Sequence, residues 1–387
     1  MPRIYLDNAA TTWPKPEAVW QAVDDYQRRL GAPAGRGAYH EAAEVERLVD
    51  QCRSRIRALI GAEDPRQIVF TLNGTDSLNQ AIHGCLRPGD HVITSVCEHN
   101  SVLRPLRQWQ DRGDVRVTYV RCDGAGYISP DDVRKAIQPR TRLIALLHAS
   151  NVTGAVQPLA EVGAIAREHD VLLLVDAAQS LGHVPVDVAE LGCDLLAAPG
   201  HKGLYGPLGT GVLYLGPGVE SELVTTRQGG TGTRSDEDIQ PMSLPDRYES
   251  GNLNVPGIVG LNAGVAEVQR RGLAASAEHE RELTERLLAG LAEIRGVTLY
   301  GPRAGDSKQR VGVVSFNLDN FEPQELAALL DSTRSIQVRA GIHCAPRMHE
   351  ALGTSPRGTV RFSIGLYNTP EDIDAALSVL REIAWTG

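Results

Sequence analysis

Two residues with clear chemical potential lie at the ends of consecutive apolar segments. Asp176 follows the apolar run 171–175, which has the composition of a buried strand, and Lys202 lies in the glycine-rich segment 200–206. Ligands of open α/β sheets bind at the carboxyl ends of strands, so a single crossover could bring this acid and this lysine together. A pyridoxal phosphate enzyme needs such a pair, because the lysine forms a Schiff base and the acid keeps the pyridine nitrogen protonated. Taken singly, the two residues also fit a snorkelling surface lysine and a helix-capping aspartate.

Polar residues that follow other predicted strands would reach the same rim. These residues are His99, Asn151, Gln179 and His201. In addition, Gly74 and Thr75 open a predicted helix, where free backbone N–H groups and a hydroxyl would suit a phosphate. The agreement among these segments favours a cofactor site.

The elements that must position these residues follow an α/β pattern. Apolar runs predict the strands 68–72, 91–96, 115–120, 143–148, 171–175 and 211–215, with one more short run before Pro199. Helical spacing covers 17–30 and 39–61, and a long helical region runs from about 254 to 295. We expect an N-terminal segment (1–16) that packs with a small domain, a large cofactor-binding domain (17–265) and the small α+β domain itself (266–387).

Composition limits the class of protein. The chain has 387 residues, 42% of them hydrophobic, so it can bury a large core. Its net charge is −9 without a basic block, which argues against nucleic-acid or anionic-membrane partners. No apolar run approaches the ~20 residues of a transmembrane helix. The start lacks a signal-peptide pattern, so we expect a soluble cytoplasmic protein.

The six cysteines do not form CxxC pairs, so we expect neither a metal site nor a thioredoxin-like motif. In a cytoplasmic chain of this size they should be reduced thiols. All but one fit the role of small buried hydrophobes: Cys52, Cys85, Cys97, Cys122 and Cys193. Cys344 differs, because Arg339 and His343 precede it and should place its thiol in an electropositive, accessible loop.

Several of these segments together resemble one family. Over nearly its full length the chain is similar to the cysteine desulfurases of the class V aminotransferase fold, in the branch close to the SUF-type and selenocysteine lyase-like enzymes. The matching segments include Leu6-Asp-Asn-Ala-Ala-Thr-Thr12, Ser150-Asn-Val-Thr-Gly154, Val175-Asp-Ala-Ala-Gln179, Gly200-His-Lys202, Arg339-Ala-Gly-Ile-His-Cys344-Ala-Pro346 and Arg361-Phe-Ser-Ile-Gly-Leu-Tyr-Asn368. The resemblance implies a fold type I, aspartate aminotransferase-like transferase with a large seven-stranded α/β/α domain and a small α+β domain.

The resemblance also implies a pyridoxal 5′-phosphate enzyme that is a homodimer. By matched position, Lys202 would be the Schiff-base lysine and Asp176 the partner of the pyridine nitrogen. His99 would stack on the ring and take part in catalysis. The remaining cofactor contacts would come from Gly74, Thr75, Asn151, Gln179, His201 and Asn252, the last of which occupies a place where relatives often carry a threonine that reaches the partner subunit's phosphate.

For the reaction, the resemblance implies conversion of L-cysteine to L-alanine with sulfur passed to Cys344 as a persulfide, for delivery to an acceptor protein. Asn151 and Arg361 would bind the amino-acid substrate, since a guanidinium grips a carboxylate with two parallel hydrogen bonds. Once the substrate amine has replaced Lys202 on the cofactor, the freed lysine amine would take the substrate's Cα proton. One departure from the family pattern is Pro199, where many relatives have a serine whose hydroxyl bonds the phosphate.

Three other interpretations stay open from the sequence. The first is another pyridoxal phosphate reaction of the same fold: a selenocysteine or other C–S lyase, an aminotransferase or an epimerase. Most of those reactions have no use for a cysteine at 344. The second is a sulfur-relay or scaffold protein without catalysis, and the third a nicotinamide-dependent oxidoreductase, although no glycine fingerprint follows the first strand.

Overall fold

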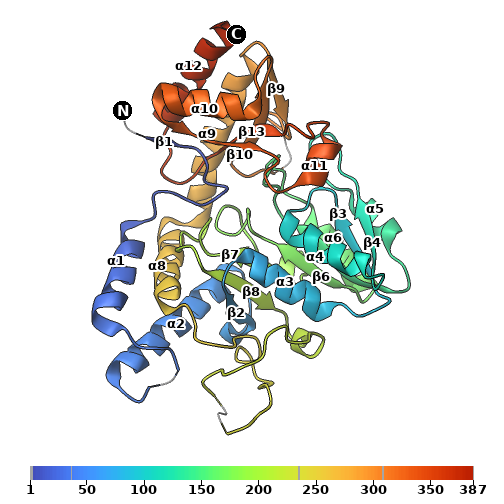
Figure 1. The fold of residues 1–387 in the computed structure, drawn as a ribbon, viewed down its shortest axis with the longest axis vertical. Coiled ribbons are helices and arrows are strands. Elements are labelled where there is room, and N and C mark those ends of the chain that lie inside the picture. The colour runs from blue at the N-terminus through green and yellow to red at the C-terminus, as the bar shows by residue number, and fades with distance from the viewer. Residues whose placement is uncertain (1–2, 36, 234–235, 307–308, 387) are drawn as a thin grey trace.

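The computed structural model describes residues 3–35, 37–233, 236–306 and 309–386. Its larger part is built on a seven-stranded sheet (Figure 1). The strand order is β2 (Ile68–Thr71), β8 (Gly211–Leu215), β7 (Leu195–Pro199), β6 (Leu172–Asp176), β5 (Thr141–Leu147), β3 (His91–Ser95) and β4 (Arg116–Val120). Strand β8 is antiparallel to both neighbours, and the pairs from β7 to β4 are parallel. The predicted seven-stranded α/β architecture is confirmed.

Helices cover both faces of this sheet, because its strands are apolar on both sides. Within β6, Leu173 and Val175 belong to one core cluster and Leu174 to another, as the two-residue period of a strand requires. The first cluster packs against α2 (His40–Leu59), α6 (Leu159–Glu168) and α8 (Val255–Arg271), and the second against α3 (Gly74–Cys85) and α4 (Asn100–Asp111). The shorter elements of this part are α1 (Glu17–Asp25), a π-helical turn (Tyr26–Leu30), α5 (Pro130–Ala136) and α7 (Val188–Leu191).

The smaller part lies at the other end of the molecule (Figure 1) and has its own core. A four-stranded antiparallel sheet runs in the order β12 (Arg339–Gly341), β13 (Thr359–Ser363), β10 (Val313–Leu318) and β9 (Val297–Tyr300). The helices of this part are α9 (Leu273–Ala292), α10 (Pro323–Arg334), α11 (Pro346–Ala351) and α12 (Pro370–Thr386). The sequence suggested one helical region from 254 to 295, whereas the structure has two helices, because Gly272 adopts φ 82° and ends α8.

The start of the chain adds a separate two-stranded sheet to the smaller part. Strand β1 (Ile4–Tyr5) pairs in parallel with β11 (Ile336–Gln337), and Ile4 and Leu6 are buried in the core of the smaller part. The domain limits expected at 16 and 265 stay a prediction. Among the described residues, no helix has the length and apolar character needed to cross a membrane.

Candidate active site

A cavity of about 220 Å³ lies at the carboxyl ends of β6 and β7, where the large sheet meets the β12–β13 end of the small one. It brings together all but one of the residues singled out in the sequence. Its lining includes Gly74, Thr75, His99, Asn151, Asp176, Gln179, His201, Lys202, Cys344 and Arg361. Segments far apart in the chain therefore meet at one place, as strand-end placement predicts.

Lys202 and Asp176 both line the cavity, where Asp176 is buried and Lys202 half-buried. Asp176 is the last residue of β6, and its Oδ1 accepts a hydrogen bond from the Ala178 amide at 2.9 Å. Burial raises the pKa of Asp176, while the Ala178 amide and Lys202 hold it down. Burial lowers the pKa of Lys202 to about 8, against the opposing attraction of Asp176. The amine of Lys202 is thus partly neutral near physiological pH, as a nucleophilic or basic lysine must be.

His99 is a neutral ring with a defined tautomer. It caps α4, because its Nδ1 accepts the Ser101 backbone N–H at 3.0 Å. A backbone N–H can only donate, so Nδ1 carries the lone pair and the proton resides on Nε2. Burial lowers the pKa of His99 to about 4, helped by the positive charge of Lys202. The Ser101 hydroxyl also contacts Thr75 Oγ1 at 2.7 Å, which ties this ring to the start of α3.

The start of α3 forms one end of the cavity and is suited to an anion. The first backbone N–H groups of a helix have no partner within the helix. A Cβ built on Gly74 would lie 3.0 Å from Pro199 Cδ, so glycine lets the α3 backbone approach β7 closely. His201 Nδ1 is buried without a hydrogen-bond partner in the described part of the chain. Pro199 offers no hydroxyl here, and its contact with Gly74 instead fixes the distance between α3 and β7.

Arg361 is fully buried on β13 and is ion-paired with Asp7. Its Nη2 lies 2.8 Å from Asp7 Oδ1, and its Nη1 donates to the Asn151 carbonyl oxygen at 3.1 Å. Its Nε is buried and has no partner among the described residues. The Asn151 side chain donates to the His343 carbonyl oxygen at 2.6 Å. Asn151 therefore joins the arginine to residues 342–345, the loop between β12 and α11 that carries Cys344 and is called the cysteine loop below.

The cysteine loop has an unusual backbone. His343 and Cys344 have φ of 49° and 59°, a region that costs a non-glycine residue about 1–3 kcal/mol and is common at functional sites. The Cys344 carbonyl oxygen accepts the Asn100 amide at 2.7 Å, and its half-buried thiol lies 3.9 Å from Arg339 Nη2. The surroundings of this thiol are therefore cationic, as expected.

The expectation that His343 adds positive charge is wrong. Its ring is buried, with Nε2 within 3.2 Å of both oxygens of Thr359. Burial lowers the pKa of His343 to about 2, and the charges of Arg361 and Arg339 act in the same direction. The imidazole stays neutral, so the positive charge beside Cys344 comes from the arginines.

Sequence reasoning expected the N-terminal segment to pack with the small domain, but it gave residues 7–15, here called the N-terminal strap, no role in the cavity, although their motif was part of the resemblance. Besides Asp7, it contributes the Ala9 carbonyl oxygen, which accepts from Gln179 Nε2 at 2.9 Å. Thr12 Oγ1 and Lys15 Nζ donate to the His201 carbonyl oxygen at 3.2 and 2.6 Å. Burial lowers the pKa of Lys15 to about 7. A lysine beside prolines, in a segment rich in small polar residues, was the available signal.

Asn252 is the predicted site residue that the structure does not bring to the cavity. It is exposed and lines two other hollows, one beside Arg53 and Glu249 and one beside Thr210. A contact between Asn252 and the cofactor site of the same chain is thus not part of the described structure.

Comparison with known proteins agrees with this geometry. The aminotransferase class-V family model matches residues 4–376. The chain belongs to the class V aminotransferase family. It is 40% identical to a probable cysteine desulfurase of Methanothermobacter thermautotrophicus over 99% of this chain and 95% of that protein, and 33% identical to a cysteine desulfurase of Haloferax volcanii over 99% and 90%.

Structural similarity to this family is equally extensive. The apo cysteine desulfurase of Thermococcus onnurineus NA1 superimposes with a TM-score of 0.92 at 34% identity, covering 100% of this chain and 95% of that one. The fold of a class V aminotransferase, expected from the motifs, is therefore confirmed from the first strand to the last helix.

Proposed function

We propose that this chain is a pyridoxal phosphate-dependent cysteine desulfurase that converts L-cysteine to L-alanine and receives the sulfur on Cys344 as a persulfide. One observation carries the proposal: Cys344 lines the same cavity as Lys202, Asp176 and Arg361. A reaction confined to the amino group would need the lysine, the carboxylate and the arginine, but no thiol. The names of the similar proteins support the same activity.

The residues present fit the cofactor. The start of α3 and the unpartnered His201 Nδ1 supply donors for a phosphate, and Gly74 lets the start of α3 lie close to β7, which leads to His201. The carboxylate of Asp176 would pair with a ring nitrogen, and His99 would lie against the ring. When bound, pyridoxal phosphate supplies an electron sink that acidifies the substrate's Cα–H and weakens its Cβ–S bond.

Arg361 would bind the substrate carboxylate. Its guanidinium is already oriented by Asp7 and by the Asn151 carbonyl oxygen, so little side-chain freedom remains to be lost on binding. The buried Nε, which has no partner in the described chain, marks unused donor capacity. Asn151 would fix the position of the substrate relative to the cysteine loop, because its side chain is bonded to that loop.

Lys202 and Cys344 would divide the proton and sulfur chemistry. With a pKa of about 8, the Lys202 amine can accept the Cα proton near neutral pH. The Cys344 thiolate would attack the substrate sulfur, so that an S–S bond forms as the C–S bond breaks. The Cβ carbon then takes up a proton, and the proton held by Lys202 returns to Cα, so that the product leaves as alanine. Arg339 would stabilise the thiolate before the attack.

The persulfide sulfur would pass to an acceptor protein, for uses such as iron–sulfur cluster assembly. We further propose a cytoplasmic homodimer in which Asn252 reaches the phosphate of the partner subunit. The exposed position of Asn252, away from the cavity of its own chain, supports this placement. The division into segments 1–16, 17–265 and 266–387 belongs to the same proposal.

Product analysis tests the function directly. The purified protein is incubated with L-cysteine and a reductant, and both sulfide and alanine are measured for wild type, Cys344→Ala and Cys193→Ser. We expect both products from wild type and from the Cys193 control, and a loss of sulfide from Cys344→Ala. Equal sulfide release by wild type and Cys344→Ala would refute the persulfide route, and alanine without sulfide from any variant would point to another reaction.

A further inference from the structure

Two thiols outside the cavity lie just past the carboxyl ends of two neighbouring strands of the large sheet. Cys97 and Cys122 follow β3 and β4, and the register of these parallel strands pairs Ser95 with Val120. The pairing continues past the strands, because the Val96 amide donates to the Val120 carbonyl oxygen at 3.0 Å. Neighbouring strands lie about 4.8 Å apart, within the Cα separation of about 4.4–6.8 Å that a disulfide spans. The Cys97 thiol donates to the Gly126 carbonyl oxygen at 3.7 Å, and the two thiols are near enough for each to shift the pKa of the other.

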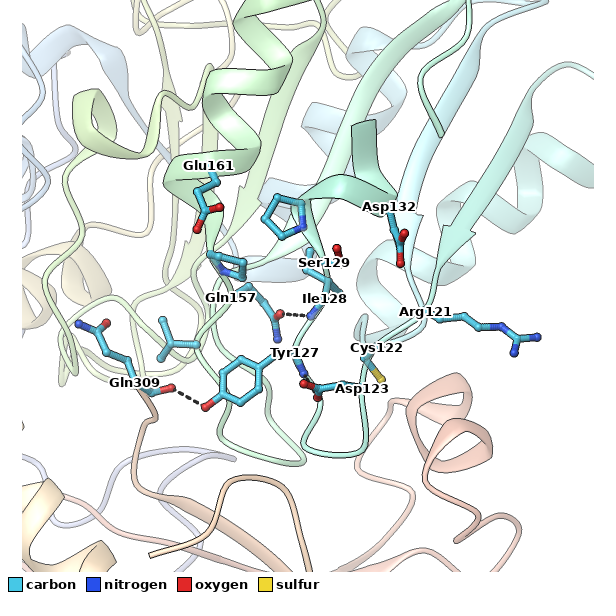
Figure 2. Close-up of a pocket in the computed structure, with 13 residues that line it drawn as sticks. Arg121, Cys122, Asp123, Tyr127, Ile128, Ser129, Asp132, Gln157, Glu161 and Gln309 are labelled. Carbon is cyan, nitrogen blue, oxygen red and sulfur yellow. Dashed lines mark hydrogen bonds between the residues drawn. The ribbon is translucent and has the colours of Figure 1, made fainter. Parts of the chain in front are cut away.

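One member of the pair is open to small molecules and the other is not. Cys97 is fully buried, whereas the half-buried Cys122 lines a groove of about 760 Å³. Figure 2 shows Cys122 beside Asp123 at the edge of this groove, with Gln157 and Tyr127 further along it. The groove is held open by fixed bonds, since Gln157 Oε1 accepts the Ile128 amide at 2.9 Å.

The surroundings of the two thiols shift their pKa values in opposite directions. Interaction with the Cys97 thiol lowers the pKa of Cys122, against the opposing effect of burial, so Cys122 is the better thiolate. The same interaction, together with burial and the nearby Glu98, raises the pKa of Cys97. A reactive, accessible thiol next to a protected one is the arrangement of a redox-sensitive pair.

We propose that Cys97 and Cys122 form a reversible oxidation site for a small hydroperoxide that enters through the groove. The Cys122 sulfur attacks the peroxide, the O–O bond breaks, and Cys122 becomes a sulfenic acid while water or an alcohol leaves. The Cys97 sulfur then attacks the sulfenic sulfur, an S–S bond forms, and the S–O bond breaks to release water. In total, two thiols lose two electrons and the peroxide gains them. Thiol reductants reverse the change.

The disulfide would act on the cavity through short connections. Cys97 is two residues before His99, and Cys122 Sγ lies 4.0 Å from Met348 Sδ in α11, directly after the cysteine loop. Bond formation draws the sulfurs from contact to about 2.05 Å, so the β3 or β4 end must move. A displacement of about 1 Å can cost up to about 10²-fold in rate when it misplaces reacting groups. The expected effect on the cavity rests on the proposed function, whereas the formation of the disulfide does not.

The linkage is tested on the full-length Cys344→Ala protein, which lacks the thiol expected to react first. Hydrogen peroxide is added, remaining thiols are alkylated under denaturing conditions, and tryptic peptides are analysed by mass spectrometry. Arg121 provides a cleavage site between the two cysteines, and fragmentation distinguishes Cys97 from Cys85 in the linked peptide. We expect a Cys97–Cys122 cross-link that dithiothreitol removes. Cys122 oxidised to a sulfinic acid while Cys97 remains alkylatable would overturn the proposal.

Matched variants and a second readout complete the test. In the Cys344→Ala background, Cys122→Ser should abolish the cross-link, and Cys193→Ser, which removes a buried thiol elsewhere, should leave it intact. L-Alanine serves as a non-reducing probe of the cavity, by its effect on the visible absorbance of the bound cofactor. Oxidation should slow this absorbance change about 10-fold or more, reversibly, and Cys122→Ser should prevent the effect. An unchanged response of the cross-linked protein would overturn the link to the cavity but not the proposed function.

Discussion

Asp7→Asn offers the sharpest test of how the buried arginine is held. Asp7 Oδ1 and Arg361 Nη2 are 2.8 Å apart, and the arginine side chain is only 2% exposed. At an effective dielectric constant of 20, this separation corresponds to roughly 6 kcal/mol of attraction. Asp7 is 21% exposed and asparagine keeps one hydrogen-bond acceptor, so the net loss is smaller. We expect the free energy of unfolding to fall by about 2–3 kcal/mol.

The assay is urea unfolding with and without L-alanine. An amino-acid carboxylate would replace the missing counter-ion, so saturating L-alanine should stabilise Asp7→Asn more than wild type. The control is Asp374→Asn, which breaks an ion pair with Arg286 at 2.5 Å on the surface, where both partners are about half exposed and solvent screens the charges. That variant should unfold almost like wild type. If Asp7→Asn also unfolds like wild type, the pair does not compensate the buried guanidinium and the reasoning fails.

Three further predictions concern the cofactor and substrate contacts. The rate at which cofactor-free protein takes up pyridoxal phosphate should rise about tenfold per pH unit below pH 8 and level off above it, because the pKa of Lys202 is lowered to about 8 and the neutral amine is the reacting form. Stopped-flow absorbance measures this rate, and a rate that does not change with pH would contradict the assignment. Arg361→Lys should lower kcat/KM for L-cysteine by about 10–100-fold, since an ammonium group cannot make two parallel hydrogen bonds to a carboxylate. A decrease of less than twofold in steady-state kinetics would exclude carboxylate binding at this residue. Gly74→Ala should weaken cofactor affinity by about 1–3 kcal/mol, because the new Cβ would lie 3.0 Å from Pro199 Cδ and push α3 outward. A fluorescence titration measures the affinity, and an unchanged value would show that α3 can shift freely.

Much of this protein was accessible from sequence, because its signals are local. Runs such as 172–176 are apolar on both faces of a strand and end in a polar residue, and that pattern alone predicts a buried sheet with a ligand edge. The residue types at those edges then limited the chemistry. Lys202 and Asp176 indicated the cofactor, and Cys344 indicated what the cavity could do beyond reactions of the amino group.

The tertiary structure decided which charges face each other. Asp7 and Arg361 are separated by almost the whole chain, and no periodicity predicts that they meet. Lys15 on the His201 carbonyl oxygen and the neutral ring of His343 follow from burial, which depends on packing between segments that are far apart in the sequence. Cys97 and Cys122, each plausible alone as a small hydrophobe, became a pair only through the register of β3 and β4. Residue types determine the available chemistry, but pKa values and contacts depend on distance and solvent exclusion, which only the folded chain sets.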